Sequence, residues 1–182
     1  MAASQQALLR AGLPALPLVE AMHTQDAILR GRNPYEGYQR SVGLEYADLA
    51  ERVAAHPLYQ AALARAQGRT VMTVHRLMNL FLILTLFSDR LESQDVVEFG
   101  SFRGGSLLFI GTVLQRIYPK ARVWGFDTFA GMPVTDASVD LHKQADFAET
   151  SVQEVRAALD AAGLDNVTLV PGLVQDLSLI HI

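Results

Sequence analysis

Cysteine is absent from all 182 residues of the chain. Its absence excludes disulfide bonds, thiolate metal sites and a cysteine nucleophile. An excess of positive charge is missing as well, because 15 Lys and Arg stand against 19 Asp and Glu, for a net charge of −4. Without a basic field the chain lacks the usual electrostatic means of binding nucleic acid or an anionic membrane. We therefore expect neither partner, and a small-molecule substrate instead.

Long hydrophobic runs are also missing. The longest, residues 77–87, has about half of the ~20 residues that cross a bilayer, and it contains Asn79 and Thr85. It predicts a buried helix. The first 22 residues carry one arginine and two prolines, Pro14 and Pro17, a pattern unlike a secretory signal. The expected location is the cytoplasm.

Half of the residues are hydrophobic, enough for the core of one globular unit. Apolar periodicity predicts helices over residues 46–54, 58–66 and 71–91, whereas residues 1–40 are loop-rich. We assign residues 1–94 to an N-terminal helical cap that serves oligomerisation, which makes a homo-oligomer a candidate assembly.

The pattern changes near Asp95. Short apolar runs predict strands over residues 96–99, 122–126 and 167–170, and two amphipathic stretches predict helices over residues 106–118 and from a capping box at Ser151 to Gly163. Strands that alternate with helices predict an α/β fold, here an incomplete doubly wound (Rossmann-like) sheet. Its ligand should lie at the carboxyl ends of the strands.

The first of these ends holds Gly100, Gly104 and Gly105, which allow a ligand to approach the backbone. Phe102 breaks the Gly-x-Gly-x-x-Gly spacing of dinucleotide sites. The carboxylate of Glu98 disfavours a pyrophosphate but suits a cofactor with an ammonium and a sulfonium group, and S-adenosylmethionine carries both. The alternative is a plain turn, since many doubly wound proteins have glycines there.

The second strand ends at Asp127, about 20 residues past the glycine loop, where a carboxylate can hold both hydroxyls of a ribose. The alternative for Asp127 is an Asx-turn or a helix cap. Phe129, two residues later, either packs on the adenine or belongs to the core.

Two motifs together, residues 98–105 (EFGSFRGG) and 125–133 (GFDTFAGMP), resemble the macrocin O-methyltransferase family of class I methyltransferases. Segments at 68–70, 76–80 and 150–155 are similar to the same family, so the resemblance extends over about residues 68–176. It implies a seven-stranded sheet, S-adenosylmethionine as cofactor, a divalent metal such as Mg²⁺, and methylation of hydroxyls, often on sugars of natural products. Phe102 departs from the tryptophan that the family commonly has.

The resemblance and the loop patterns together give the candidate cofactor residues. Those expected at the methionine end and around the nucleoside are Glu98, Gly100, Ser101, Gly104, Gly105, Ser106, Asp127, Thr128 and Phe129. Arg103 is either a ligand of the cofactor carboxylate or a structural ion-pair partner, and Asp176 is either near the adenine or a surface residue. The five histidines, at 23, 56, 75, 142 and 181, lack metal-ligand spacing. We expect no metal site in this chain, and a lid is one reading of the loop around His142.

In the resembled family the acidic catalytic residues follow a fourth strand, so we expect them beyond this chain. Residues 95–176 then form the first half of a cofactor domain, and residues 177–182 match the translation of a sequencing adapter. The expectation is an S-adenosylmethionine-dependent O-methyltransferase that is inactive as this fragment and poorly soluble. The alternatives are a nucleotide-dependent oxidoreductase and a non-catalytic protein that keeps the fold.

Overall fold

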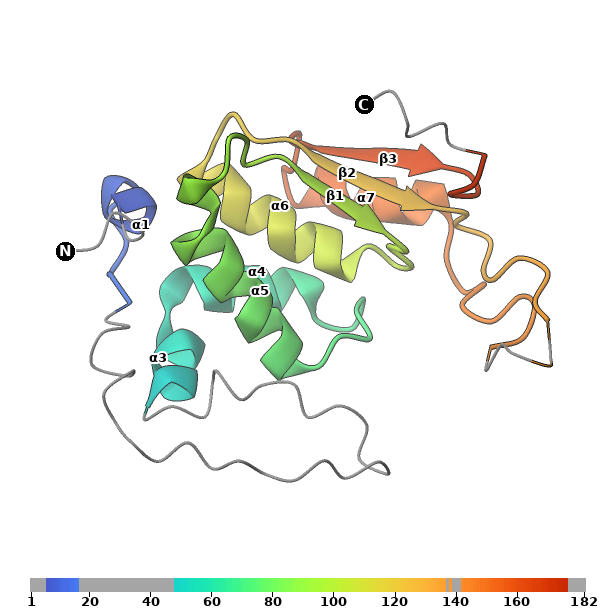
Figure 1. Ribbon diagram of the computed structural model, residues 1–182, viewed down its shortest axis with the longest axis horizontal. Helices are drawn as coiled ribbons and strands as arrows, with labels where there is room; N and C mark the ends of the chain where they lie inside the picture. Colours follow the sequence, from blue (N-terminus) through green and yellow to red (C-terminus); the bar gives the residue numbers. More distant parts are fainter. Residues whose placement is uncertain (1–5, 17–47, 137, 139–141, 177–182) are drawn as a thin grey trace.

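The computed structural model describes residues 6–16, 48–136, 138 and 142–176. Figure 1 shows a helical part below a small sheet. The elements in chain order are α1 (Gln6–Arg10), α3 (Leu49–Ala55), α4 (Pro57–Ala66), α5 (Val74–Leu86), the 3₁₀ turn η3 (Ser88–Arg90), β1 (Val96–Phe99), α6 (Gly105–Ile117), β2 (Val123–Asp127), α7 (Val152–Ala161) and β3 (Val167–Pro171).

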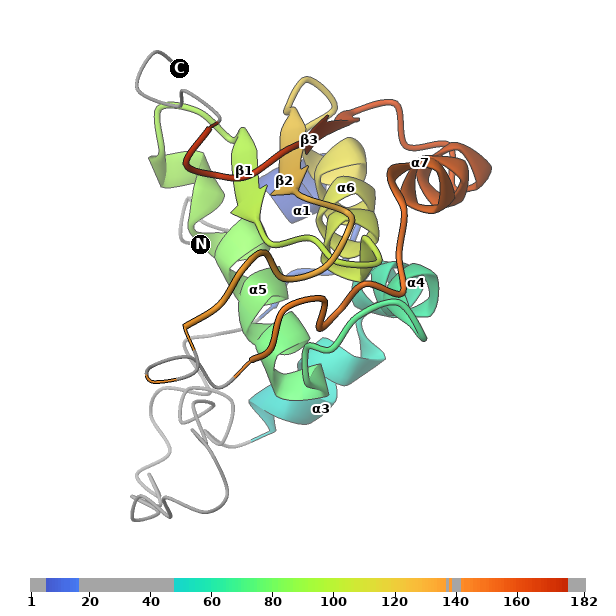
Figure 2. The ribbon, with the colours of Figure 1, turned by 90° about the vertical axis from the view of Figure 1, so that its right-hand side faces the viewer.

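The three strands form a parallel sheet in the order β1-β2-β3, with Val96 opposite Val123 and Val123 opposite Val167. Helix α6 connects β1 to β2, and α7 connects β2 to β3. Because both connections advance in the same direction, α6 and α7 lie on the same face of the sheet (Figures 1 and 2). The predicted α/β class and incomplete doubly wound sheet are confirmed.

The helices before β1 pack on the side of α6 that faces away from the sheet, and α4 and α5 lie against it (Figure 2). Tyr59 of α4 joins the layers, because its ring is 5.5 Å from that of Phe81 in α5 and 5.7 Å from that of Phe109 in α6. All three side chains are buried. The helical region and the sheet therefore share one hydrophobic core.

Three helices predicted before residue 95 are present as α3, α4 and α5, but the last is shorter than residues 71–91. It begins after Thr73, whose hydroxyl accepts a hydrogen bond from Arg76 N, and it ends at Leu86. Helix α1 lies in the stretch expected to be loop. Residues 17–47 lie outside the described part of the chain.

The two faces of the sheet have different environments. Glu98 and its neighbour Gly125 face α6, and a methyl group on Gly125 would meet the side chain of Leu107. On the opposite face Val97 is 43% exposed and Phe99 is 52% exposed. That face of β1 therefore has no covering layer among the described residues.

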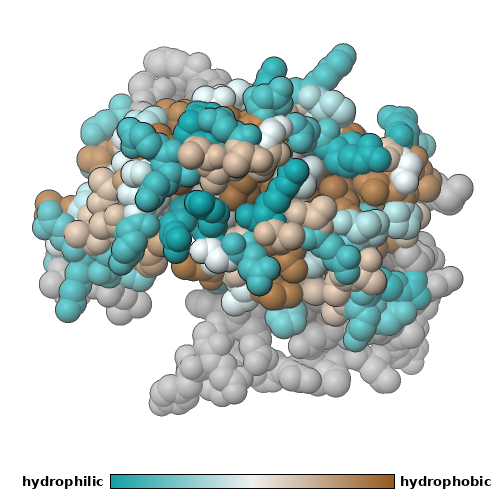
Figure 3. Space-filling view, turned by 180° about the vertical axis from the view of Figure 1, so that it is seen from behind, coloured by the Kyte–Doolittle hydropathy of each residue, from teal (hydrophilic) through white to brown (hydrophobic). Residues whose placement is uncertain are grey.

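No described helix is long and apolar enough to cross a membrane. The surface on the side opposite to Figure 1 is a mosaic in which hydrophilic side chains surround small apolar patches (Figure 3).

Candidate functional site

Two cavities lie at the carboxyl ends of β1 and β2. The smaller one, of about 110 Å³, is lined by Arg69, Thr70, Val71, Met72, Glu98, Gly100, Ser101, Phe102 and Ser106. The larger one, of about 460 Å³, is lined by residues that include Asp127, Thr128, Met132, His142, Phe147 and Leu173. Val71, Gly100 and Phe102 line both, so the cavities adjoin at the loop after β1. This is the place expected for a ligand in a doubly wound sheet.

The glycines after β1 shape this loop in different ways. Gly100 has φ +80° and lines both cavities, as a close backbone approach to a ligand requires. A methyl group on Gly104 would lie 2.5 Å from Val155 Cγ1 of α7, and one on Gly105 would lie 2.6 Å from the carbonyl carbon of Arg69. Gly104 and Gly105 therefore allow two segments to pack closely against α6.

Glu98 is the main polar group of the smaller cavity. Its Oε2 and the hydroxyl of Ser101 are buried and have no hydrogen-bond partner among the described residues. The pKa of the Glu98 carboxyl is raised above its ordinary value, mainly because the group is buried. The nearby hydroxyls of Ser106 and Ser101 lower this pKa, and the charge of Asp127 raises it further. Buried polar atoms without partners are rare in folded proteins. Here they form a ready acceptor site for a ligand with a donor or a positive charge.

Asp127 ends β2 and joins the two loops. Its Oδ2 accepts a hydrogen bond of 2.7 Å from Phe102 N, and its Oδ1 accepts one of 2.7 Å from Phe129 N. The second bond is the Asx-turn that the sequence offered as an alternative. Each carboxylate oxygen has two lone pairs, so both can still accept a hydroxyl from a ligand in the larger cavity. The ribose role of Asp127 stays a prediction.

Thr128 and Phe129 have different surroundings. Thr128 lines the larger cavity, and its hydroxyl donates a 2.7 Å hydrogen bond to Gly131 O. The Phe129 side chain is 6% exposed, belongs to the hydrophobic core and is absent from the lining of that cavity. The structure thus places Phe129 in the core, which was the second of its two readings.

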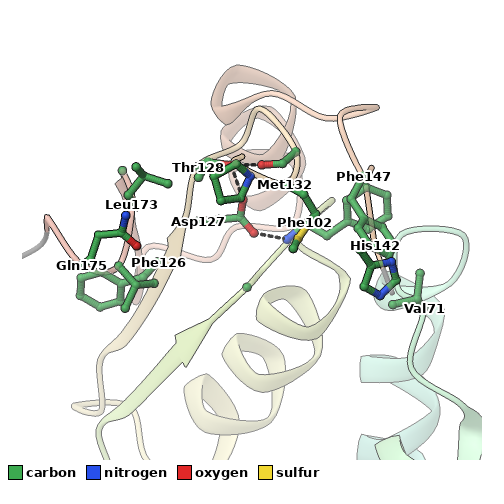
Figure 4. A pocket seen from close by; sticks show the side chains of 15 residues that line it. Val71, Phe102, Phe126, Asp127, Thr128, Met132, His142, Phe147, Leu173 and Gln175 are labelled. Atoms are coloured by element: carbon green, nitrogen blue, oxygen red, sulfur yellow. Dashed lines mark hydrogen bonds between the residues drawn. The ribbon is translucent and has the colours of Figure 1, made fainter. Parts of the chain in front are cut away.

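The rest of the larger cavity's wall comes from several separate segments, among them the loop around His142, for which a lid was one reading of the sequence. Figure 4 shows Val71, His142 and Phe147 on one side of Asp127, with Leu173, Gln175 and Phe126 on the other. The ring of Phe147 is 5.4 Å from that of Phe102 and 5.0 Å from that of His142. His142 Nδ1 is 3.4 Å from Asp146 Oδ2. A period or motif cannot reveal such contacts, because they depend on how loops fold back.

Backbone strain is concentrated around these cavities. Among the described residues, four other than glycine have positive φ: Phe102, Phe129, Ala145 and Phe147, at 48°, 51°, 68° and 64°. Such conformations cost of order 1–3 kcal/mol each and persist where surrounding contacts hold them. The hydrogen bonds that Phe102 N and Phe129 N donate to the Asp127 carboxylate are contacts of this kind.

Other predicted site residues lie outside the two cavities. Arg103 is exposed and lines a separate outer cleft of about 780 Å³, together with Arg69, Glu149 and Glu154. Asp176 lines neither cavity. Within residues 6–16, 48–136, 138 and 142–176, no three His, Asp or Glu side chains are grouped so that they could hold a metal ion.

The chain is similar to a curated O-methyltransferase and to a solved methyltransferase structure. A curated relative from Streptomyces olivaceus, 8-demethyl-8-(2,3-dimethoxy-alpha-L-rhamnosyl)-tetracenomycin-C 4'-O-methyltransferase, is 34% identical over 120 residues, which are 60% of this chain and 46% of the relative. The chain thus spans less than half of that relative. The crystal structure of CalS11, a calicheamicin methyltransferase, matches 79% of this chain and 63% of its own at 19% identity. The TM-score of this match is 0.44.

The family model for macrocin-O-methyltransferase (TylF) matches residues 18–181, nearly the whole chain. That match includes β1, β2 and both loops that form the cavities. The chain belongs to the macrocin-O-methyltransferase (TylF) family.

Proposed function

We propose that this chain binds S-adenosylmethionine across the two cavities, and that the protein is an O-methyltransferase for a hydroxyl of a small molecule, a sugar or other natural product. One observation carries the cofactor assignment: Glu98 Oε2 and the Ser101 hydroxyl are buried without partners in a cavity beside a glycine turn. A pyrophosphate would be repelled by this carboxylate, whereas an ammonium group would be stabilised.

The residues of the larger cavity suit the nucleoside part of the same cofactor. Asp127 can accept from ribose hydroxyls while it keeps its backbone bonds, and the rest of the wall is mainly apolar. When bound, the cofactor supplies a methyl group on a positively charged sulfur. The chain's own residues hold its two ends and exclude water from between them.

The acceptor is assigned from the relatives. The name of the relative from Streptomyces olivaceus describes methylation at the 4′ oxygen of a rhamnosyl group. We infer a related acceptor class here, an uncharged hydroxyl compound. The described residues offer no cluster for the divalent metal that the family resemblance implies, so no step is assigned to a metal.

Isothermal titration calorimetry with the whole chain tests the cofactor assignment. S-adenosylhomocysteine should bind at one site per chain, and NAD should not bind. Glu98→Gln should weaken binding of S-adenosylhomocysteine by about 10-fold or more, because a charge-assisted contact contributes ~1.5–3 kcal/mol. Binding of NAD without S-adenosylhomocysteine would favour the oxidoreductase alternative. A chain that binds neither would favour the non-catalytic one.

A further inference from the structure

One wall of the smaller cavity comes from residues 69–72, which precede α5 and are far from β1 in the sequence. The peptide between Arg69 and Thr70 lies on the N-terminal turn of α6, where a methyl group on Gly105 would be 2.6 Å from Thr70 N. Thr70 Oγ1 accepts a 3.0 Å hydrogen bond from Met72 N, which fixes the turn. This segment therefore lies directly opposite the loop after β1.

The residues that line the smaller cavity include one acid, Glu98, and one base, Arg69. No ion pair or side-chain hydrogen bond of Arg69 is found within the described part of the chain, and Glu98 Oε2 is likewise without a partner. A free α-amino acid group carries an ammonium and a carboxylate on one carbon. A small cavity whose lining residues include one of each sign, neither of them in an ion pair among the described residues, complements such a zwitterion.

We propose that Arg69 binds the carboxylate at the amino-acid end of the cofactor, while Glu98 faces its ammonium group. This inference rests on the proposed function. The planar guanidinium can donate two parallel N–H bonds to a carboxylate, which fixes the orientation of this end. Ser101 is 3% exposed, and its buried hydroxyl, which has no partner among the described residues, can add a further hydrogen bond.

Arg103 lies in the glycine loop and is the arginine that the sequence suggested for the carboxylate. It lines the outer cleft but not the smaller cavity. Arg69 lines both, so it stands in the wall between them. Glu149 and Glu154 line the outer cleft but not the smaller cavity. The structure thus assigns the carboxylate to Arg69, a residue remote from the glycine motif.

Two nucleosides separate this role from a general effect on the site. S-adenosylhomocysteine has the amino-acid end, whereas 5′-methylthioadenosine has the same nucleoside and sulfur without it. Arg69→Gln should weaken S-adenosylhomocysteine binding by about 10- to 100-fold and change 5′-methylthioadenosine binding less than about 2-fold. Arg69→Lys keeps the charge but loses the two parallel N–H donors of the guanidinium, so its affinity for S-adenosylhomocysteine should lie between those of the wild type and Arg69→Gln.

Arg103→Gln is the matched control and should leave both affinities near those of the wild type. Unchanged S-adenosylhomocysteine binding in Arg69→Gln, a selective loss in Arg103→Gln instead, or an equal loss of both nucleosides in Arg69→Gln would each overturn the assignment. Retained 5′-methylthioadenosine binding also shows that the Arg69 variants are folded. If the wild type binds neither nucleoside, the proposed function fails, and this inference fails with its premise.

Discussion

Glu98 illustrates how a single residue can trade stability for binding. Its folded-state pKa is raised, mainly by burial, so the native state holds this proton more tightly than the unfolded state does. Ionisation therefore costs folding free energy, and this cost grows as pH rises from the unfolded pKa of about 4.5 through the raised folded pKa. The cost is present in full once the pH exceeds the raised folded pKa.

Glu98→Gln removes that cost. We expect the variant to be more stable than the wild type at pH 7.5, by about 1 kcal/mol in urea unfolding, with a smaller difference at pH 4.5. The same variant should bind S-adenosylhomocysteine more weakly. A variant less stable than the wild type at pH 7.5 would contradict this account of the carboxyl.

His56 has the opposite pH response. It is 3% exposed, its Nδ1 accepts from Leu58 N, and its Nε2 lies 3.0 Å from Pro14 O. Burial lowers its pKa and the bond to Pro14 raises it, with a net lowering. A proton on Nδ1 would remove the acceptor that Leu58 N needs, so the native ring stays neutral.

As pH falls through about 6.5, the unfolded state takes up a proton at His56 that the native state does not, and stability declines. Urea unfolding should therefore give a lower free energy of unfolding at pH 5.5 than at pH 8, and this difference should be smaller in His56→Asn. Asn also serves as an N-cap for α4, so the fold is kept. His75→Asn, at an exposed position, should keep the full pH dependence.

Asp127 holds two residues with positive φ through two backbone N–H groups. Asp127→Asn leaves one acceptor oxygen and turns an amide N–H₂ toward an N–H, so we expect a loss of about 1–3 kcal/mol in stability even without a ligand. Thermal unfolding of the ligand-free chain measures this. An unchanged melting temperature would show that Asp127 does not hold the loops together.

Among the helices, α6 positions the site, because segments pack closely at both of its glycines. Gly105→Ala would push a methyl group into the backbone of Arg69 and Thr70, whereas Gly111→Ala would meet the side chains of Val167 and Leu164. Both variants should lose stability, by about 1–3 kcal/mol. Only Gly105→Ala should selectively weaken binding of the amino-acid end, as calorimetry with the two nucleosides would show. If Gly105→Ala and Gly111→Ala changed the binding of the two nucleosides equally, this different role of the two glycines would be contradicted.

Much of the element order could be predicted from local patterns. Strand β1 has the predicted limits, Val96 to Phe99. At the predicted start of α7, Ser151 Oγ accepts a hydrogen bond from Glu154 N, which is the N-cap bond of a capping box. Helix α5 is shorter than its apolar run, because side-chain capping at Thr73 fixes its start. Helix α1 was not predicted, since its five residues are too few for a clear period.

The residues of the site could be predicted where they lie at or just after the end of a strand. Glu98 and Asp127 lie at the carboxyl ends of β1 and β2, and Ser101 follows β1; strand ends in a parallel sheet meet at one edge. Arg69, His142 and Phe147 reach the cavities from loops whose paths depend on tertiary packing. The core position of Phe129 likewise depends on the turn that Asp127 imposes.

For the whole molecule, the uncovered face of β1 has a physical cost. Val97 and Phe99 are exposed, and no strand pairs with the outer edge of β1 within the described residues. An apolar face beside an open strand edge favours association between chains. We expect light scattering to show self-association that rises with protein concentration, and Phe99→Lys to reduce it. Ile83→Lys, on the exposed side of α5, should reduce it less.

Phe102 borders both cavities, with its amide bound to Asp127 and its carbonyl bound to the hydroxyl of Thr150. Anchored from both sides, this residue has little freedom to move aside. A molecule that fills both cavities passes Val71, Gly100 and Phe102, the residues that line both, so the fixed backbone of Phe102 limits the width available to the connecting atoms. Two compounds with the same terminal groups can therefore differ in affinity when the atoms that connect those groups differ in width.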